Sequence, residues 1–178
     1  MQMSVELVPV GDVATRAAAE RLIREYLEFI AEIAMQNYRL TFDIEAMIAS
    51  DLHDESKFYP PAGRFYVVRH AGQFVGVGCL KRLTPTVAEI QRMYVRPSVR
   101  GVGTGRLLVE RLLADAKGMQ FKTIRLESLR VLSAAHALYR SVGFREIEPY
   151  NESSMTDYQS RDALKTYHSS AVFMELTL

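Results

Sequence analysis

The pattern of apolar and polar positions divides this chain into short strands and amphipathic helices. Apolar residues recur at helical spacing after Asp12, from Asp43, from Gly105 and after Ser133, each time along one helical face. Runs rich in β-branched and aromatic residues predict strands at 5–10, 64–69, 74–80, 88–95, 123–129 and 171–178. The order is β, α, α, β, β, β, α, β, α, β, which indicates an α/β or α+β fold with a mixed sheet.

Local signals refine this outline. Asp12 or Thr15 is placed to cap the first helix and Ser133 the last, and Phe29 is expected in the core. Gly76 and Gly78 interrupt an apolar strand, which predicts a bulge or a close backbone approach. The polar stretch 150–170 predicts a long loop with one helical turn, and we interpret it as a lid over a substrate.

Composition narrows the class of protein. The 178 residues are expected to form one domain, residues 1–178, and the net charge of +1 argues against a nucleic-acid-binding surface. No apolar run is long enough for a membrane span, and no leader pattern is seen. The single cysteine, Cys79, is expected to be buried and favours a reducing, cytoplasmic setting. The histidines show no metal-ligand spacing, so no metal is expected, and a homodimer is left open.

The segment 88–116 carries the strongest chemical signal. A strand leads into RPSVRGVGTG and then into an amphipathic helix, so backbone N–H groups converge where the helix starts. Alternating glycines allow a ligand to approach the backbone closely. Between Arg92 and Arg111 the chain has five arginines and a single acid, Glu110; the arginines are Arg92, Arg96, Arg100, Arg106 and Arg111. We interpret the segment as a site for a phosphate-bearing ligand.

Two common glycine motifs do not fit this segment. The phosphate-binding loop of nucleoside triphosphatases needs a Gly-Lys-Ser/Thr ending, which is absent. The dinucleotide fingerprint needs a third glycine or alanine where this chain has Arg106.

The sequence instead resembles the GNAT superfamily of acyl-CoA-dependent N-acyltransferases. RGVGTG follows a Val-Arg-Pro strand exit, and LYRSVGF follows about thirty-five residues later. Arg100, Gly103 and Gly105 match the family signature Q/R-x-x-G-x-G/A. The resemblance implies a mixed, mostly antiparallel central sheet with helices on both faces, splayed at the acyl-CoA site. It also implies acetyl-CoA as cosubstrate and an amine as acceptor.

The same resemblance suggests which residues form the site. Backbone groups at the strand end would pair with the pantetheine arm, and loop N–H groups would bind the pyrophosphate. These cofactor-binding positions are Met93, Tyr94, Val95, Arg100, Gly101, Val102, Gly103, Thr104, Gly105 and Arg106. Members of the family often place an asparagine where this chain has Leu132, so that contact is absent here or is replaced by Ser133.

Acyl transfer to an amine needs a base to take a proton and benefits from an acid that protonates the departing thiolate. Glu89 is the candidate base, and the alternative is a solvent-facing charge at a strand end. Tyr139, in the L-Y-x-x-x-G-F segment, is the candidate acid, and the alternative is a core tyrosine.

Three functions remain open at this level. The favoured one is acetylation of a small molecule or free amino compound. A non-catalytic acyl-CoA-binding or regulatory domain would keep the loop without the chemistry. An unrelated phosphate or nucleotide binder would bind a nucleotide in place of acetyl-CoA.

Overall fold

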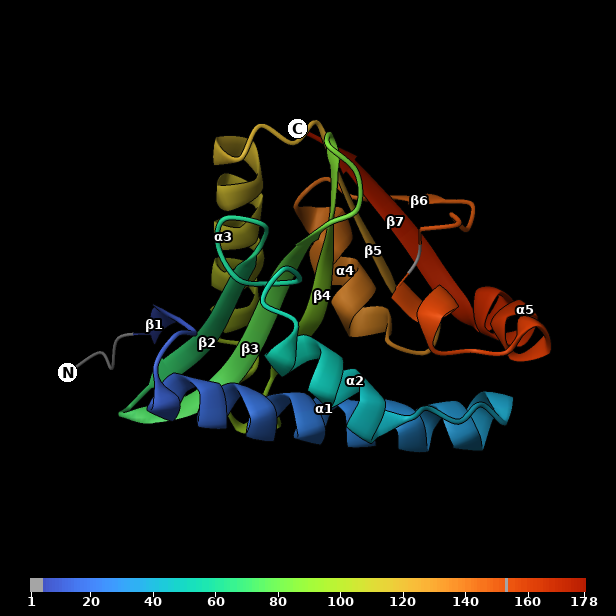
Figure 1. Cartoon of the computed structure of the whole chain (residues 1–178), viewed down its shortest axis with the longest axis horizontal. Helices are drawn as coiled ribbons and strands as arrows, with labels where there is room; N and C mark the ends of the chain where they lie inside the picture. Colours follow the sequence, from blue (N-terminus) through green and yellow to red (C-terminus); the bar gives the residue numbers. More distant parts are fainter. Residues whose placement is uncertain (1–4, 153) are drawn as a thin grey trace.

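The computed structural model describes residues 5–152 and 154–178, and it places helices on both faces of a seven-stranded sheet (Figure 1). The strand order is β1-β2-β3-β4-β5-β7-β6, and every neighbouring pair is antiparallel except β4 and β5. The strands are β1 (Val5–Pro9), β2 (Arg64–His70), β3 (Gln73–Arg82), β4 (Val87–Val95), β5 (Thr123–Leu129), β6 (Arg145–Ile147) and β7 (Ala171–Thr177). The mixed, mostly antiparallel sheet expected from the resemblance is confirmed.

The helices agree with the sequence pattern except near the end of the chain. They are α1 (Val13–Tyr38), α2 (Ile44–His53), α3 (Thr104–Gly118), α4 (Ser133–Ser141) and α5 (Arg161–Ser170), with short 3-10 turns η1 (Pro97–Val99) and η2 (Ser154–Asp157). The expected long loop at 150–170 is wrong in its second half. The side chain of Ser160 accepts a hydrogen bond from the Ala163 N–H, and this cap starts α5. The cap expected from Ser133 is also wrong, because Leu132 occupies the cap position without a side-chain bond.

Two hydrophobic cores lie on opposite faces of the sheet, because successive strand residues alternate between them. Along β2, Phe65 packs with α1 and α2, whereas Tyr66 belongs to the core beneath α3 and α4. Cys79 is fully buried, as expected. The expectation for Phe29 is wrong, since its side chain lies on the outer side of α1 and is 38% exposed.

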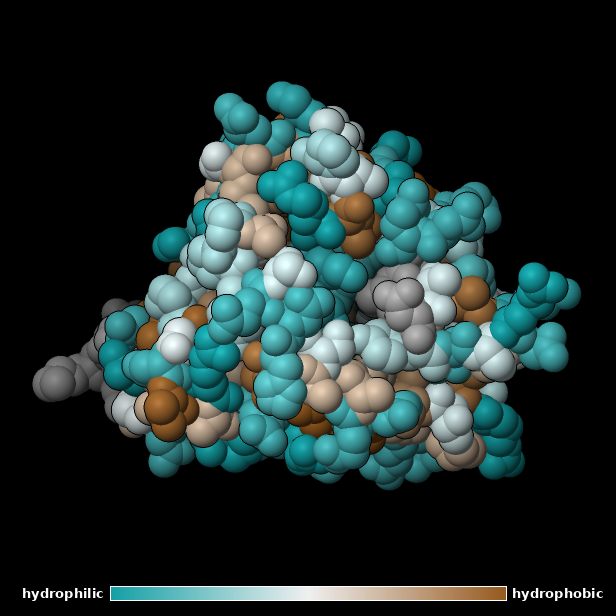
Figure 2. Space-filling view, in the orientation of Figure 1, coloured by the Kyte–Doolittle hydropathy of each residue, from teal (hydrophilic) through white to brown (hydrophobic). Residues whose placement is uncertain are grey.

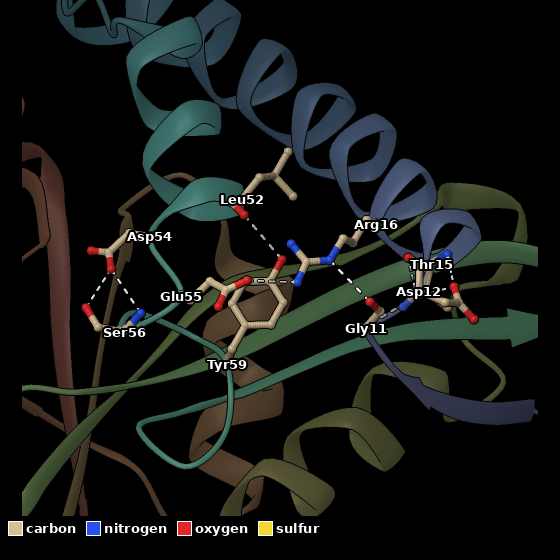
Figure 3. Close-up of polar contacts among 9 residues, drawn as sticks. All are labelled: Gly11, Asp12, Thr15, Arg16, Leu52, Asp54, Glu55, Ser56 and Tyr59. Atoms are coloured by element: carbon tan, nitrogen blue, oxygen red, sulfur yellow. Dashed lines mark hydrogen bonds and ion pairs between the residues drawn. The ribbon is translucent and has the colours of Figure 1, made fainter.

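The start of α1 is tied to the loop between α2 and β2 (Figure 3). Asp12 caps α1, because its Oδ1 accepts the Thr15 N–H at 2.7 Å and the Thr15 hydroxyl in turn accepts the Asp12 N–H at 3.1 Å. Arg16 reaches across to Glu55 at 3.3 Å, and its guanidinium lies 4.6 Å from the centre of the Tyr59 ring. The loop is therefore held against the helix on both sides of residue 57.

The face seen in Figure 2 is mainly hydrophilic, with hydrophobic residues scattered over it. Across residues 5–152 and 154–178, no helix combines the length and the apolar character needed to cross a membrane. Over the same ranges, histidine, cysteine and acidic side chains form no cluster of three that could hold a metal ion.

Candidate active site

The sheet opens between β4 and β5. These parallel strands pair only over Val87–Glu89 and Thr123–Arg125, whereas β5 pairs with β7 along its whole length. Beyond this point a cavity of about 80 Å³ lies between the strands. Its walls come from residues 90–93 of β4 and 126–129 of β5, together with residues of α1, α2, α4, η2 and α5. The expected splay of the sheet is therefore present.

The glycine loop leaves the start of α3 open. Gly103 is the N-cap with φ 89° and offers no side chain to cap the helix, and Gly101 has φ 80°. A Cβ at either position would meet no atom within 4 Å, so the space beside the loop is free. Thr104 is buried, and its Oγ1 has no partner within the described residues. Open N–H groups and an unsatisfied hydroxyl at a helix N-terminus fit the pyrophosphate of a CoA ester.

The arginines around the loop have protein partners. Arg100 donates from Nε to the Val95 carbonyl oxygen at 2.7 Å, and Arg106 donates from Nη2 to the Ser141 hydroxyl at 2.7 Å. Val102, at the loop tip, is 70% exposed. Two of the five arginines that lie close together in the sequence are thus hydrogen-bonded to other groups of the protein.

The strand end that precedes the loop divides between the two sides of the sheet. Met93 lines the cavity and packs with the core beneath α3, whereas Tyr94 packs with the α1 core and Val95 is buried. Arg96, next in the chain, pairs with Glu25 of α1. This strand end therefore lies between the cavity and the loop.

Glu89 is fully buried, so the alternative of a solvent-facing charge at a strand end is wrong. The Tyr150 hydroxyl donates to one of its carboxylate oxygens and the Gln91 side-chain amide to the other, both at 2.5 Å. Burial, and then the nearby Glu127 carboxylate, raise the pKa of Glu89 to about 8. A carboxyl group with this pKa can hold or release a proton near neutral pH.

Tyr139 is buried on α4 and forms part of the cavity wall. Its ring packs edge-to-face on Phe144 with centroids 5.9 Å apart, so its position is well defined. Its hydroxyl donates no hydrogen bond within the described part of the chain. Burial raises its pKa, so it stays protonated and can act as a donor.

Several polar residues in the cavity wall were not singled out as site residues from the sequence. Gln91, Arg92, Glu127 and Tyr167 all line the cavity. The sequence offered no signal for Glu127, because polar and apolar residues alternate along this strand and Arg125 carries a charge as well. The sequence placed Arg92 only among the arginines of the segment interpreted as a phosphate site, whereas the structure pairs it with Asp51.

The protein family described as "Acetyltransferase (GNAT) family" matches this sequence over residues 27–144, about two thirds of the chain. The chain belongs to the GNAT acetyltransferase family. An uncharacterised N-acetyltransferase of Escherichia coli is 34% identical over 116 residues, which cover 62% of this chain and 70% of that protein. One of Schizosaccharomyces pombe is 32% identical over 133 residues, covering 72% and 76%.

Solved GNAT structures share the fold along the whole chain. A Streptococcus agalactiae acetyltransferase superposes with a TM-score of 0.69 at 20% identity, covering 100% of both chains. A Thermoplasma acidophilum N-acetyltransferase solved with coenzyme A has a TM-score of 0.69 at 16% identity, covering 99% of this chain and all of the other. The GNAT chain described here binds acetyl-CoA and transfers an acetyl group to an amine.

Proposed function

We propose that this GNAT enzyme acetylates a small amine inside the cavity between β4 and β5. The observation that carries the proposal is the enclosure of this cavity by the chain's own later segment. Met155 from η2 and Tyr167 from α5 form part of its wall, and both are buried. A cavity of about 80 Å³ that is walled by several segments of the chain suits a small acceptor.

The names of two relatives support a small acceptor. An N-acetylaspartate synthetase of Danio rerio is 32% identical over 119 residues, which cover 64% of this chain and 42% of that protein. An IAA acetyltransferase of Azospirillum brasilense is 28% identical over 134 residues, covering 75% and 80%.

Glu89 is the proposed base. An alkyl amine is protonated near neutral pH and attacks a thioester only after it loses that proton. Glu89 lies behind the cavity wall, next to Gln91, so a water molecule would carry the proton from the amine to its carboxylate. Glu127 faces the cavity and raises the pKa of Glu89, which brings that pKa closer to the pKa of the amine.

Acetyl-CoA would be held by the loop and the strand end. The N–H groups of 101–106 and the Thr104 hydroxyl would face its pyrophosphate, and the backbone of 93–95 would pair with its pantetheine arm. The protonated hydroxyl of Tyr139 would supply a proton to the departing thiolate. The base and the acid both belong to the protein, so we propose that the acetyl group is transferred directly, without a metal. We also propose that the enzyme works in the cytoplasm.

The test measures release of the CoA thiol over a panel of amines, amino acids and peptides. We expect small amines to be acetylated, with kcat/KM rising with pH through about 8, the pKa of Glu89. Glu89→Gln should remove the part of this rise that belongs to Glu89 and leave only the titration of the amine, and Glu127→Gln should move the Glu89 part to lower pH because a neighbouring negative charge is lost. A preference for peptides over every small amine would contradict the proposal.

A further inference from the structure

Three charged side chains from separate segments meet beside the cavity. Asp51 comes from α2, Lys57 from the loop that follows it, and Arg92 from β4. The Lys57 Nζ lies 2.5 Å from one carboxylate oxygen of Asp51, and the Arg92 Nε lies 2.5 Å from the other. The Arg92 Nη2 adds a second bond to Asp51 at 3.3 Å. All three side chains are buried, so water screens this cluster poorly.

Arg92 reaches this cluster because β4 contains a bulge. Its φ is 55°, which is uncommon for a residue other than glycine. The pairing with β3 shifts between Val77 and Cys79, so two residues of β4 face the single Gly78. In a regular strand, Arg92 would point with Ile90 toward the α3 face. The bulge turns it to the side of Gln91 and α2, and bulges often re-aim a side chain beside an active site.

Lys57 is held in the cluster by the loop shown in Figure 3. The loop residues on either side of it contact α1, through the Glu55 and Tyr59 contacts with Arg16. The Lys57 Nζ also bonds to the Ser50 hydroxyl at 3.2 Å and to the Tyr158 hydroxyl at 3.4 Å, both neutral groups.

The cluster has more positive than negative charge, because two cations share one carboxylate. Burial disfavours the charge on Arg92, but Asp51 outweighs this and raises its pKa, so Arg92 is a permanent cation. Within the described residues, Arg92 donates only from Nε and Nη2, which leaves Nη1 without a partner on a side chain that lines the cavity. A buried excess of positive charge is unfavourable until an anion pairs with it.

The opposite charge lies elsewhere in the same cavity wall. Glu127 contributes a carboxylate from β5, with Glu89 close behind the wall. Apolar side chains of α1 and α2, such as Leu27, Ile30 and Met47, line the space as well. The cavity is therefore positive near α2 and negative near β5.

We propose that the acceptor carries a carboxylate as well as its amine, as an amino acid does, and that this carboxylate binds Arg92. Asp51 orients the guanidinium, and Lys57 adds the positive charge that the carboxylate neutralises. The amine then lies toward Glu127 and Glu89, where it loses its proton. This inference rests on the proposed acetylation of a small amine and specifies the class of that amine.

The test compares standard L-amino acids with their α-carboxamides as acceptors, by kcat and KM from CoA thiol release. The wild-type protein should prefer the acids. In Arg92→Gln, kcat/KM for the acids should fall roughly 10- to 100-fold relative to the amides, mainly through KM. The Kd for acetyl-CoA should be unchanged. This variant keeps a neutral Asp51–Lys57 pair, so it should still fold.

Arg96→Gln is the matched control, because Arg96 also pairs with a single carboxylate, Glu25, but does not line the cavity. It should leave the ratio of acid to amide unchanged. If Arg92→Gln does not fold, Lys57→Met should lower the same ratio while the Arg92–Asp51 pair stays intact.

Two results would count against the inference, and they are distinguishable. Wild-type preference for the amides, or a ratio that neither substitution of Arg92 nor of Lys57 changes, overturns the carboxylate site but leaves amine acetylation standing. Binding of acetyl-CoA without acetylation of any acid, amide or simple amine overturns the proposed function, and the inference with it.

Discussion

Ionised Glu89 is the proposed base, but its burial makes that ionisation lower the stability of the fold. The substitution Glu89→Gln should therefore raise stability and lower activity. Its pKa rises from an ordinary value of 4.5 to about 8 in the fold, because burial and the Glu127 carboxylate disfavour its charge. As pH rises, the unfolded chain therefore loses this proton before the folded protein does. The folded state is fully favoured by this group only below about pH 4.5, and it becomes progressively less stable up to about pH 8.

The size of this cost follows from the two pKa values. Relative to acid pH, Glu89 lowers the free energy of unfolding by ~1 kcal/mol at about pH 5.5, ~3 kcal/mol at about pH 7 and ~5 kcal/mol at about pH 8.5. Glu89→Gln removes the cost because an amide does not ionise. The new side chain can accept the Tyr150 hydrogen bond and donate to the Gln91 Oε1, which has no partner within the described residues.

The assay is urea unfolding of the wild-type protein and of Glu89→Gln at these three pH values. The advantage of the variant should grow by ~3–4 kcal/mol from the lowest to the highest pH. Its acetylation rate should fall roughly 100-fold if Glu89 is the base. Glu32→Gln, at an exposed position on α1, gives the baseline for loss of a surface carboxylate. A stability difference that does not change with pH would refute the raised pKa.

Three further substitutions test the site. Gly103→Asp should abolish acetyl-CoA binding in a titration, whereas Gly72→Asp, also at positive φ in open space, should not. Tyr150→Phe removes a bond that lowers the pKa of Glu89, so the pH–rate profile should shift to higher pH, and an unshifted profile would exclude that bond's influence. Gly78→Ala should cost about 1–3 kcal/mol in thermal unfolding, because its Cβ would come within 2.9 Å of a leucine side chain; no loss would contradict this packing.

Much of the fold follows from local sequence signals. The strand at 123–129 has the expected bounds and the first helix starts after Asp12 as expected, because periodicity and a capping residue act within a few neighbours. The glycine loop could also be located, since its function depends on consecutive backbone positions. The helix at 161–170 was expected as a single helical turn within a loop, because its sequence is mostly polar.

The remaining parts of the site depend on contacts between distant segments. Tyr150 binds Glu89 across 61 positions of sequence, and Asp51 binds Arg92 across 41. The side on which Arg92 projects depends on a bulge, and strand alternation alone would place it on the opposite face. Burial of Glu89 likewise depends on which segment covers it, so its pKa could not be inferred from the strand in which it lies.

The strand order has a consequence for how the protein is made. β7 lies between β5 and β6 in the sheet, although it follows both in the chain. Among the described strands, β6 pairs only with β7, so during synthesis it must wait until β7 has left the ribosome. β7 is synthesised after Tyr150, the residue that donates a hydrogen bond to Glu89. Until β7 pairs with β5, the edge of β5 that it will cover stays exposed. A ribosome-bound chain that ends before β7 should therefore depend on chaperones.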